Sequence, residues 1–104
     1  MPANPDQEMG SAVPVPIEEV LDLHPFHPRD IPSVVEEYIH ACRAEGVALV
    51  RLVHGRGQGV QRAEVRRTLG RLPDVVSFAD AAPASGGWGA TVVTLRLSRR
   101  SGPP

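Results

Sequence analysis

The sequence has no lysine, a single cysteine and few aromatic residues. All eleven basic residues are arginines, and the aromatic side chains are Phe26, Tyr38, Phe78 and Trp88. Because Cys42 is the only cysteine, no internal disulfide can form, which excludes the disulfide-rich secreted scaffolds. No apolar run approaches the roughly 18 residues of a membrane span, and the amino terminus has no signal-peptide pattern. We therefore expect a cytoplasmic domain, without contact to a membrane, whose core is built from aliphatic side chains.

The two signs of charge are unevenly distributed along the chain. Residues 1–46 carry nine acidic residues and two arginines, a net charge of −7, whereas residues 47–104 carry nine arginines and three acidic residues, a net charge of +6. Such an asymmetry indicates an anionic partner for the basic half, and nucleic acid, DNA or RNA, is the partner expected. The alternative is that folding interleaves the two halves into a surface of mixed charge.

Hydrophobic periodicity predicts four strands and two helices in the order β-α-β-α-β-β. The strands are expected at residues 19–24, 47–53, 75–79 and 91–97, and the helices between Asp30 and Gly46 and from Val60 to Leu72. Residues 1–16 are rich in proline and poor in apolar residues, which predicts a disordered or extended lead-in. The domain is expected to span residues 17–97, followed by a flexible tail at residues 98–104.

This order of elements predicts an α/β fold of two layers. Both β-α-β crossovers should be right-handed, which makes the first three strands parallel and leaves both helices on one face of a four-stranded mixed sheet. The last two strands form a hairpin, so the fourth strand runs antiparallel. Ligands usually bind where the carboxyl ends of parallel strands meet. His24, the residues after Val53 and the loop Gly86–Gly89 all come to that edge, so we expect a site there.

A glycine-rich loop joins the second strand to the second helix. Gly55, Gly57 and Gly59 leave the backbone unshielded by side chains, and backbone N–H groups at the start of a helix suit a phosphate. His54 and Arg56 add a titratable group and a fixed cation. The alternative is a tight turn that needs glycine for its geometry alone.

Asp22 and His24 should face the side of the sheet that the helices leave uncovered. Alternation places Leu21 and Leu23 toward the helices and therefore Asp22 and His24 on the open face. Asp22 is expected to orient His24. The alternative is an ion pair between Asp22 and an arginine of a neighbouring strand, Arg51 or Arg96.

Trp88 lies among glycines in the loop after the third strand. A tryptophan at a nucleic-acid-binding edge can stack on an unpaired base. The alternative is that its ring folds down as a lid on the apolar edge of the domain.

Three segments together closely resemble the small MutS-related (Smr) domain, and in particular its stand-alone, single-domain members. They are Leu21–His24, His54–Gly59 and Gly86–Val93, and the resemblance spans residues 17–97. It implies a fold similar to the C-terminal domain of translation initiation factor 3. It also implies nicking or cleavage of nucleic acid, with links to DNA repair and to RNA cleavage. The family's LDxH motif and HGxG-type loop correspond here to Asp22 and His24, and to the loop that starts at His54.

These residues suit phosphodiester cleavage by acid–base chemistry. The reaction needs a proton acceptor, a proton donor and stabilisation of charge. We expect His24 and His54 to share the first two roles, with Asp22 orienting His24, at the catalytic centre of an endonuclease. The residues expected to bind the substrate are Gly55, Arg56, Gly57, Gly59, Arg62, Gly87 and Trp88.

No cofactor is expected at this site. Two-metal nucleases need several carboxylates, and the predicted edge offers only Asp22 in a fixed position, with Asp30 and Asp80 as loop possibilities. Acid–base cleavage without a metal is easiest on RNA, whose 2′-hydroxyl can attack the adjacent phosphorus. A route that uses a divalent ion such as magnesium is the alternative.

Two other functions fit the same pattern. One is a non-catalytic module that binds nucleic acid or the ribosome through the same basic edge. The other is a protein-interaction domain that uses the open sheet face through Leu49, Val53 and Val92.

Overall fold

The structure is a computed structural model that describes residues 18–57 and 59–97. Its strands are β1 (Glu18–Asp22), β2 (Leu49–Val53), β3 (Val75–Asp80) and β4 (Ala90–Leu95), and its helices are α2 (Ile31–Ala44) and α3 (Val60–Arg71). Three short 3-10 turns complete it, η1 (Pro28–Asp30), η2 (Pro83–Ser85) and η3 (Gly87–Gly89). The predicted order β-α-β-α-β-β is confirmed. The lead-in and the tail predicted at the two ends lie outside the described residues.

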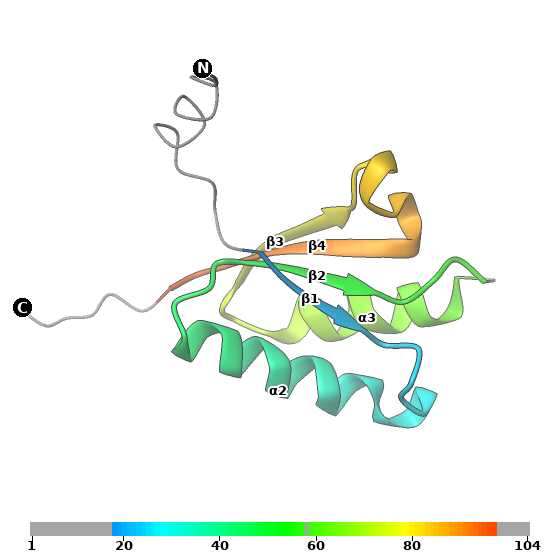
Figure 1. The fold of residues 1–104 in the computed structure, drawn as a ribbon. Helices are drawn as coiled ribbons and strands as arrows, with labels where there is room; N and C mark the ends of the chain where they lie inside the picture. Colours follow the sequence, from blue (N-terminus) through cyan, green and yellow to red (C-terminus); the bar gives the residue numbers. More distant parts are fainter. Residues whose placement is uncertain (1–17, 58, 98–104) are drawn as a thin grey trace, which may run out of the picture.

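The sheet has the order β1-β2-β4-β3. β1 pairs parallel with β2, whereas β4 pairs antiparallel with both β2 and β3. The first three strands therefore run in one direction, as predicted, with β4 inserted between β2 and β3. Both helices lie on one face of this four-stranded mixed sheet (Figure 1). The carboxyl ends of β1, β2 and β3 consequently meet at the edge where β4 begins.

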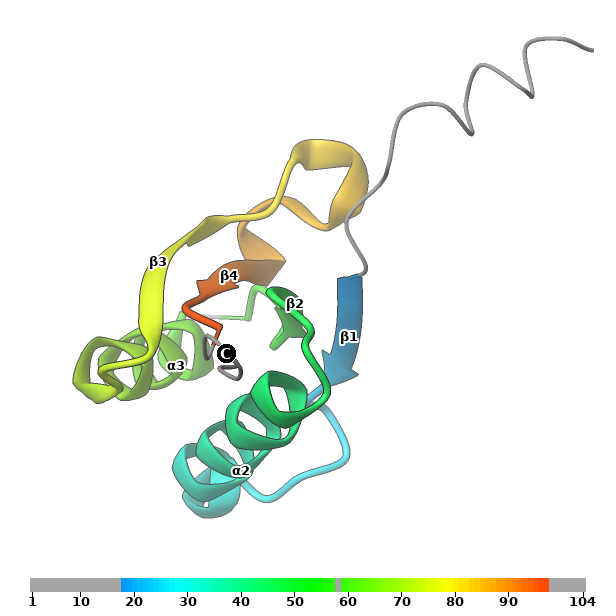
Figure 2. The same cartoon turned by 90° about the vertical axis from the view of Figure 1, so that its left-hand side faces the viewer.

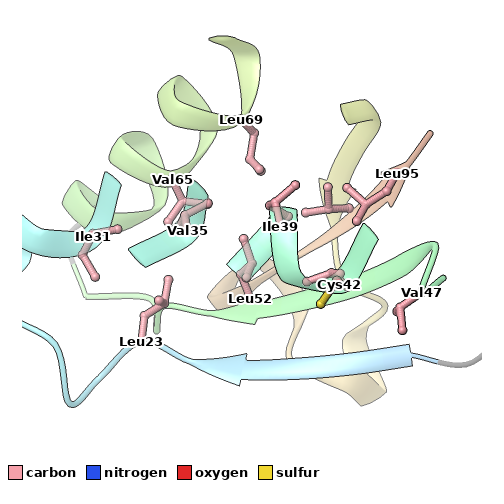
Figure 3. Packing of buried hydrophobic residues seen from close by; sticks show 12 residues of the cluster. Leu23, Ile31, Val35, Ile39, Cys42, Val47, Leu52, Val65, Leu69 and Leu95 are labelled. Atoms are coloured by element: carbon pink, nitrogen blue, oxygen red, sulfur yellow. The ribbon is translucent and has the colours of Figure 1, made fainter. Parts of the chain in front are cut away.

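The hydrophobic core fills the space between the sheet and the two helices (Figure 3). Alternate residues of the central strands face it, and the apolar stripes of α2 and α3 close it from the other side. The fully buried aliphatic residues include Leu23, Ile31, Val35, Val50, Leu52, Val65 and Val93. Cys42 is buried on the α2 stripe, as a small core side chain.

Two strands end earlier than their patterns predict. β1 stops at Asp22, because the Asp22 carboxylate accepts the backbone N–H of His24 at 2.9 Å and turns the chain ahead of Pro25. β4 stops at Leu95, although the N–H of Arg96 still donates to the carbonyl oxygen of Asp74 at 2.7 Å, in register with the Val75–Leu95 pair. At β1 a side-chain contact turns the chain, whereas at β4 the pairing with the β3 side continues for one residue beyond the strand.

The segment between β3 and β4 lies on the side of the sheet opposite the helices (Figure 2). Arg51, which faces that side from β2, donates to the carbonyl oxygen of Ser85 at 3.0 Å and lies 3.5 Å from the carboxylate of Glu18. This side of the sheet is therefore partly covered by the chain itself. Within residues 18–57 and 59–97, no helix combines the length and the apolar character that crossing a bilayer requires.

Two valines on neighbouring strands provide a test of the core. Val50 is fully buried, whereas Val20 is 45% exposed. Val50→Ala should lower the free energy of unfolding by about 2–3 kcal/mol, because it removes two buried methyl groups and leaves a cavity. Val20→Ala should change it by about 0.5 kcal/mol or less. Urea unfolding of both variants measures the difference, and equal losses would contradict the assigned faces of the sheet.

Candidate functional site

Asp22 and His24 form a hydrogen-bonded pair at the end of β1. The Asp22 carboxylate accepts the backbone N–H of His24 at 2.9 Å and its ring Nδ1–H at 2.6 Å. These two bonds, the backbone one first, hold the pKa of Asp22 below its ordinary value of 3.8. The carboxylate is therefore ionised at neutral pH, and it fixes the tautomer in which Nδ1 carries the proton and Nε2 is free. Both side chains remain open to solvent, at 60% and 61% exposed.

The contact between Asp22 and His24 is the one expected, and neither alternative ion pair forms. Arg51 instead pairs with Glu18, and Arg96 donates to the carbonyl oxygen of Pro73 at 3.4 Å. Asp22 is thus available to orient the imidazole.

The glycine-rich loop after β2 passes directly under His24. Gly55 has φ +82°, and a Cβ placed on it would lie 2.9 Å from Nε2 of His24. Any other residue here would displace the free ring nitrogen and would also adopt a strained backbone conformation. The N–H groups of His54 and Gly55 both donate to the carbonyl oxygen of Gly89, at 3.1 and 2.8 Å. These two bonds hold the loop Gly86–Gly89 against the glycine-rich loop after β2.

Arg56 extends across the Gly86–Gly89 loop. A Cβ on Gly87 would lie 2.8 Å from Nη2 of Arg56, and one on Gly89 would lie 3.2 Å from its Cγ. These glycines therefore make room for the arginine side chain, which is exposed to solvent. The three glycine and histidine segments meet at the carboxyl edge of the sheet, as the topology predicts.

A hollow of about 320 Å³ lies between His24, the loop after β2 and the start of α3. Its walls are formed by His24, His54, Gly55, Arg56, Gly57, Gly59, Val60 and Gln61. Gly59 is the N-cap of α3 and gives no side-chain hydrogen bond, so the first-turn amides are uncapped. A helix N-terminus beside an exposed arginine favours an anion. The Gly59 amide itself donates to the carbonyl oxygen of Arg56 at 2.9 Å, so it has no free N–H for the phosphate contact expected of it.

His54 is buried and has both ring nitrogens occupied. It is 4% exposed, its Nδ1–H donates to the carbonyl oxygen of Gly55 at 2.9 Å, and its Nε2 accepts the hydroxyl of Thr91 at 2.9 Å. Burial is the main cause that lowers the pKa of His54 below its ordinary value of 6.5. A neutral, fully bonded imidazole has no free nitrogen for a substrate proton. This geometry does not fit the expected acid–base role and instead ties the loop to β4.

Arg62 and Trp88 lie together beside the hollow. The Arg62 guanidinium is 5.2 Å from the centre of the Trp88 ring and donates to the Asp80 carboxylate at 2.8 and 3.2 Å. Arg62 is therefore committed to these two side chains rather than free for a phosphate. The Trp88 ring is 40% exposed and does not belong to the buried core cluster, which argues against the lid. The hydrogen bond from Arg62 is the largest cause that lowers the pKa of Asp80.

Sequence reasoning did not assign Thr91 to the site and considered Asp80 only as a loop carboxylate for a metal ion. Asp80 ends β3 and Thr91 lies in β4, so each reaches the site only through strand pairing. For His54 a signal was present, because alternation from Val50 and Leu52 places it on the buried face of β2. Within the described ranges, no three His, Cys, Asp or Glu side chains gather as they do around a metal ion.

The buried imidazole of His54 makes stability depend on pH. Because the pKa of His54 is lower in the folded state, the unfolded chain binds a proton near pH 6.5 that the folded chain does not yet bind. The free energy of unfolding should therefore fall as pH decreases below about 6.5. Urea unfolding at pH 7.5 and pH 5.5 measures this loss. In His54→Gln the free energy of unfolding should fall less between pH 7.5 and pH 5.5. An unchanged fall would show that another group causes the pH dependence.

Comparison with known proteins places this domain in a family. Residues 21–96 match the family model described as the Smr domain. Endonuclease MutS2 of Thermus thermophilus is 47% identical over 62 residues, which are 60% of this chain and 8% of that protein. Endonuclease MutS2 of Aquifex aeolicus is 33% identical over 102 residues, which are 95% of this chain and 13% of that protein. The chain thus corresponds to a small part of each of these relatives.

Two solved structures share the fold. The crystal structure of the Smr domain of Thermus thermophilus MutS2 superposes with a TM-score of 0.72 at 40% identity, over 75% of this chain and 98% of that one. YdaL, a stand-alone small MutS-related protein from Escherichia coli, superposes with a TM-score of 0.71 at 28% identity, over 83% of this chain and 70% of that one. The match of residues 21–96 and the shared fold show that this chain belongs to the Smr domain family, the family that its three motifs resemble.

Proposed function

We propose that this domain is an endonuclease that cleaves phosphodiester bonds of RNA, with His24 as the group that moves the proton. The observation that supports this most directly is the Asp22–His24 pair, whose free Nε2 lies over Gly55 at the wall of the hollow. Arg56 and the uncapped start of α3 line the same hollow. A base, a fixed cation and backbone amides thus surround one space of suitable size for a phosphate.

The proposed reaction begins with the phosphate in the hollow, beside Arg56 and the first-turn amides of α3. Nε2 of His24 takes the proton of the 2′-hydroxyl, and the 2′-oxygen forms a bond to phosphorus. The bond from phosphorus to the 5′-oxygen breaks, and the leaving oxygen takes a proton from solvent water. The hydroxide that remains takes the proton from His24, which restores the free base. The products are a 2′,3′-cyclic phosphate and a 5′-hydroxyl. Asp22 stabilises the imidazolium that forms, and Arg56 stabilises charge on the phosphate.

The similarity to MutS2 supports a nuclease and a nucleic-acid partner. The relatives in Thermus thermophilus and Aquifex aeolicus are named endonucleases, and the part of them that this chain matches is the Smr domain. In the proposed mechanism His54 holds Gly55 under His24 and takes no proton from the substrate.

Removal of the His24 imidazole tests the catalytic role. His24→Asn should lower the rate of RNA cleavage about 100- to 10,000-fold, because it removes the general base. The matched control is His40→Asn, since His40 is an exposed histidine on α2 outside the hollow, and it should leave the rate unchanged. The assay compares labelled RNA and DNA of one sequence, with magnesium and with chelator, and identifies the ends of the products. Full activity of His24→Asn contradicts this role, and activity that the chelator abolishes contradicts the metal-free route.

A non-catalytic module that binds nucleic acid or the ribosome is the second candidate. It is favoured by the burial of His54, which leaves one free histidine nitrogen at the hollow where two were expected. Under this proposal Asp22, His24 and Arg56 anchor a phosphate without breaking it. Binding of RNA with no cleavage under any of the assay conditions would favour this candidate over the endonuclease.

Both candidates require Arg56 to contact a phosphate, and salt measures that contact. Each phosphate contact to a single strand contributes about 0.7 to the slope of log affinity against log salt concentration. Arg56→Gln should reduce the slope by about that amount and weaken binding. Arg71→Gln, at the exposed far end of α3, is the matched control and should leave the slope unchanged. Equal slopes for Arg56→Gln and the unmodified protein would contradict a phosphate contact at Arg56.

A further inference from the structure

We infer that Trp88 is a stacking platform for an unpaired base next to the phosphate in the hollow, and that Asp80 positions this platform through Arg62. The domain then selects single-stranded over double-stranded nucleic acid. This inference rests on the proposed binding of nucleic acid and does not depend on cleavage.

The Trp88 ring lies next to the hollow in which we propose that the phosphate binds. A Cβ placed on Gly59 would lie 3.8 Å from Cζ3 of Trp88, and Gly59 lines the hollow. Gly87, the residue before Trp88, lies against the guanidinium of Arg56. The exposed ring therefore lies beside Gly59 at the wall of the hollow, and the residue before it lies against Arg56. A nucleotide whose phosphate occupies the hollow has its neighbouring base within reach of this ring.

Arg62 and Asp80 hold the ring in place from one side. Trp88 is the middle residue of η3 and has glycine on both sides, so its own backbone gives the ring little restraint. The Arg62 guanidinium lies over the ring and is in turn bound by the Asp80 carboxylate through Nε and Nη2. A side chain that is already ordered loses less entropy when a base stacks on it.

Arg66 also contacts Asp80. It lies 3.3 Å from the same oxygen of Asp80 and 5.0 Å from the centre of the Phe78 ring. Asp80 thus holds two arginines, each over an aromatic ring, at the side of α3 that adjoins β3. These two ion pairs fix the carboxylate to which Arg62 is bound.

The chemistry of stacking predicts the strand preference. In a duplex both faces of an internal base are covered by neighbouring bases, so a tryptophan ring can stack only after unstacking them. Single strands present free base faces, and proteins bind them by combining aromatic side chains with positive charge. A flat exposed ring beside an arginine and a phosphate-sized hollow is that combination.

The fluorescence of the protein reports directly on this site, because Trp88 is its one tryptophan. The probes are a single-stranded deoxyoligonucleotide, its duplex, and a strand of equal length and charge whose residues are abasic. We expect the base-containing single strand to quench the fluorescence and to bind more tightly than the other two. Trp88→Ala should weaken binding of that strand about 5- to 150-fold and leave the abasic strand unaffected, with Trp88→Phe intermediate. The variants are followed by anisotropy of a labelled strand.

Asp80→Asn tests the positioning role. It should lower the quenching and the preference for bases over abasic strands, without weakening binding of the abasic strand. A merely structural role would weaken both strands together. The matched control is Asp74→Asn. It breaks another ion pair, between Asp74 and Arg43 at 3.1 Å, and should leave the preference for base-containing strands unchanged.

The outcomes separate this inference from the proposed function. Equal affinity for base-containing and abasic strands, with no quenching, would overturn the stacking platform while leaving phosphate binding in place. Failure of every strand to bind would overturn the nucleic-acid partner and the platform with it. Base-dependent quenching in a protein that cleaves nothing would support the platform and overturn the endonuclease.

Discussion

The carbonyl group of Gly89 is the point on which the site depends. It accepts the backbone N–H groups of both His54 and Gly55, and so fixes the loop after β2 against the segment before β4. His54 reinforces this junction through the hydroxyl of Thr91. Once the loop is fixed, Gly55 can pass beneath His24 and Gly87 beneath Arg56, at distances that leave no room for a Cβ. Backbone packing at glycine therefore determines where the functional side chains lie.

The fold and the convergence of the motifs were predictable because both follow from local patterns. Strand alternation, helical stripes and the hand of β-α-β crossovers are enough to bring His24, the loop after β2 and the Gly86–Gly89 loop to one edge. The order of the sheet was not predicted, because it depends on which strand β4 pairs with besides β3. Arg62 and its partner Asp80 lie 18 residues apart in the chain and meet because α3 packs beside β3. No local sequence pattern predicts such a contact, because it depends on how distant elements pack together.

Ion pairs within the fold partly neutralise the uneven charge of the two halves of the chain. Glu18 pairs with Arg51, and Arg43 pairs with Asp74, so acidic and basic halves meet in the folded domain as the mixed-surface alternative requires. Arg62 and Arg66 share Asp80 within the basic half. Arg56 differs from these arginines because it lines the hollow and is exposed. An anionic ligand is therefore favoured by Arg56 and the N-terminus of α3, and not by the net charge of the basic half of the chain.

Two histidines of the same motif set acquire different chemistry from their surroundings. His24 is exposed and keeps a free Nε2, because an ionised carboxylate occupies the opposite nitrogen. His54 is buried, and backbone and hydroxyl partners occupy both of its nitrogens. A site with one mobile proton carrier suits a reaction whose nucleophile the substrate itself supplies, since the protein then has only to remove the proton of that nucleophile. The 2′-hydroxyl of RNA is such a nucleophile, which supports our proposal of RNA as the substrate.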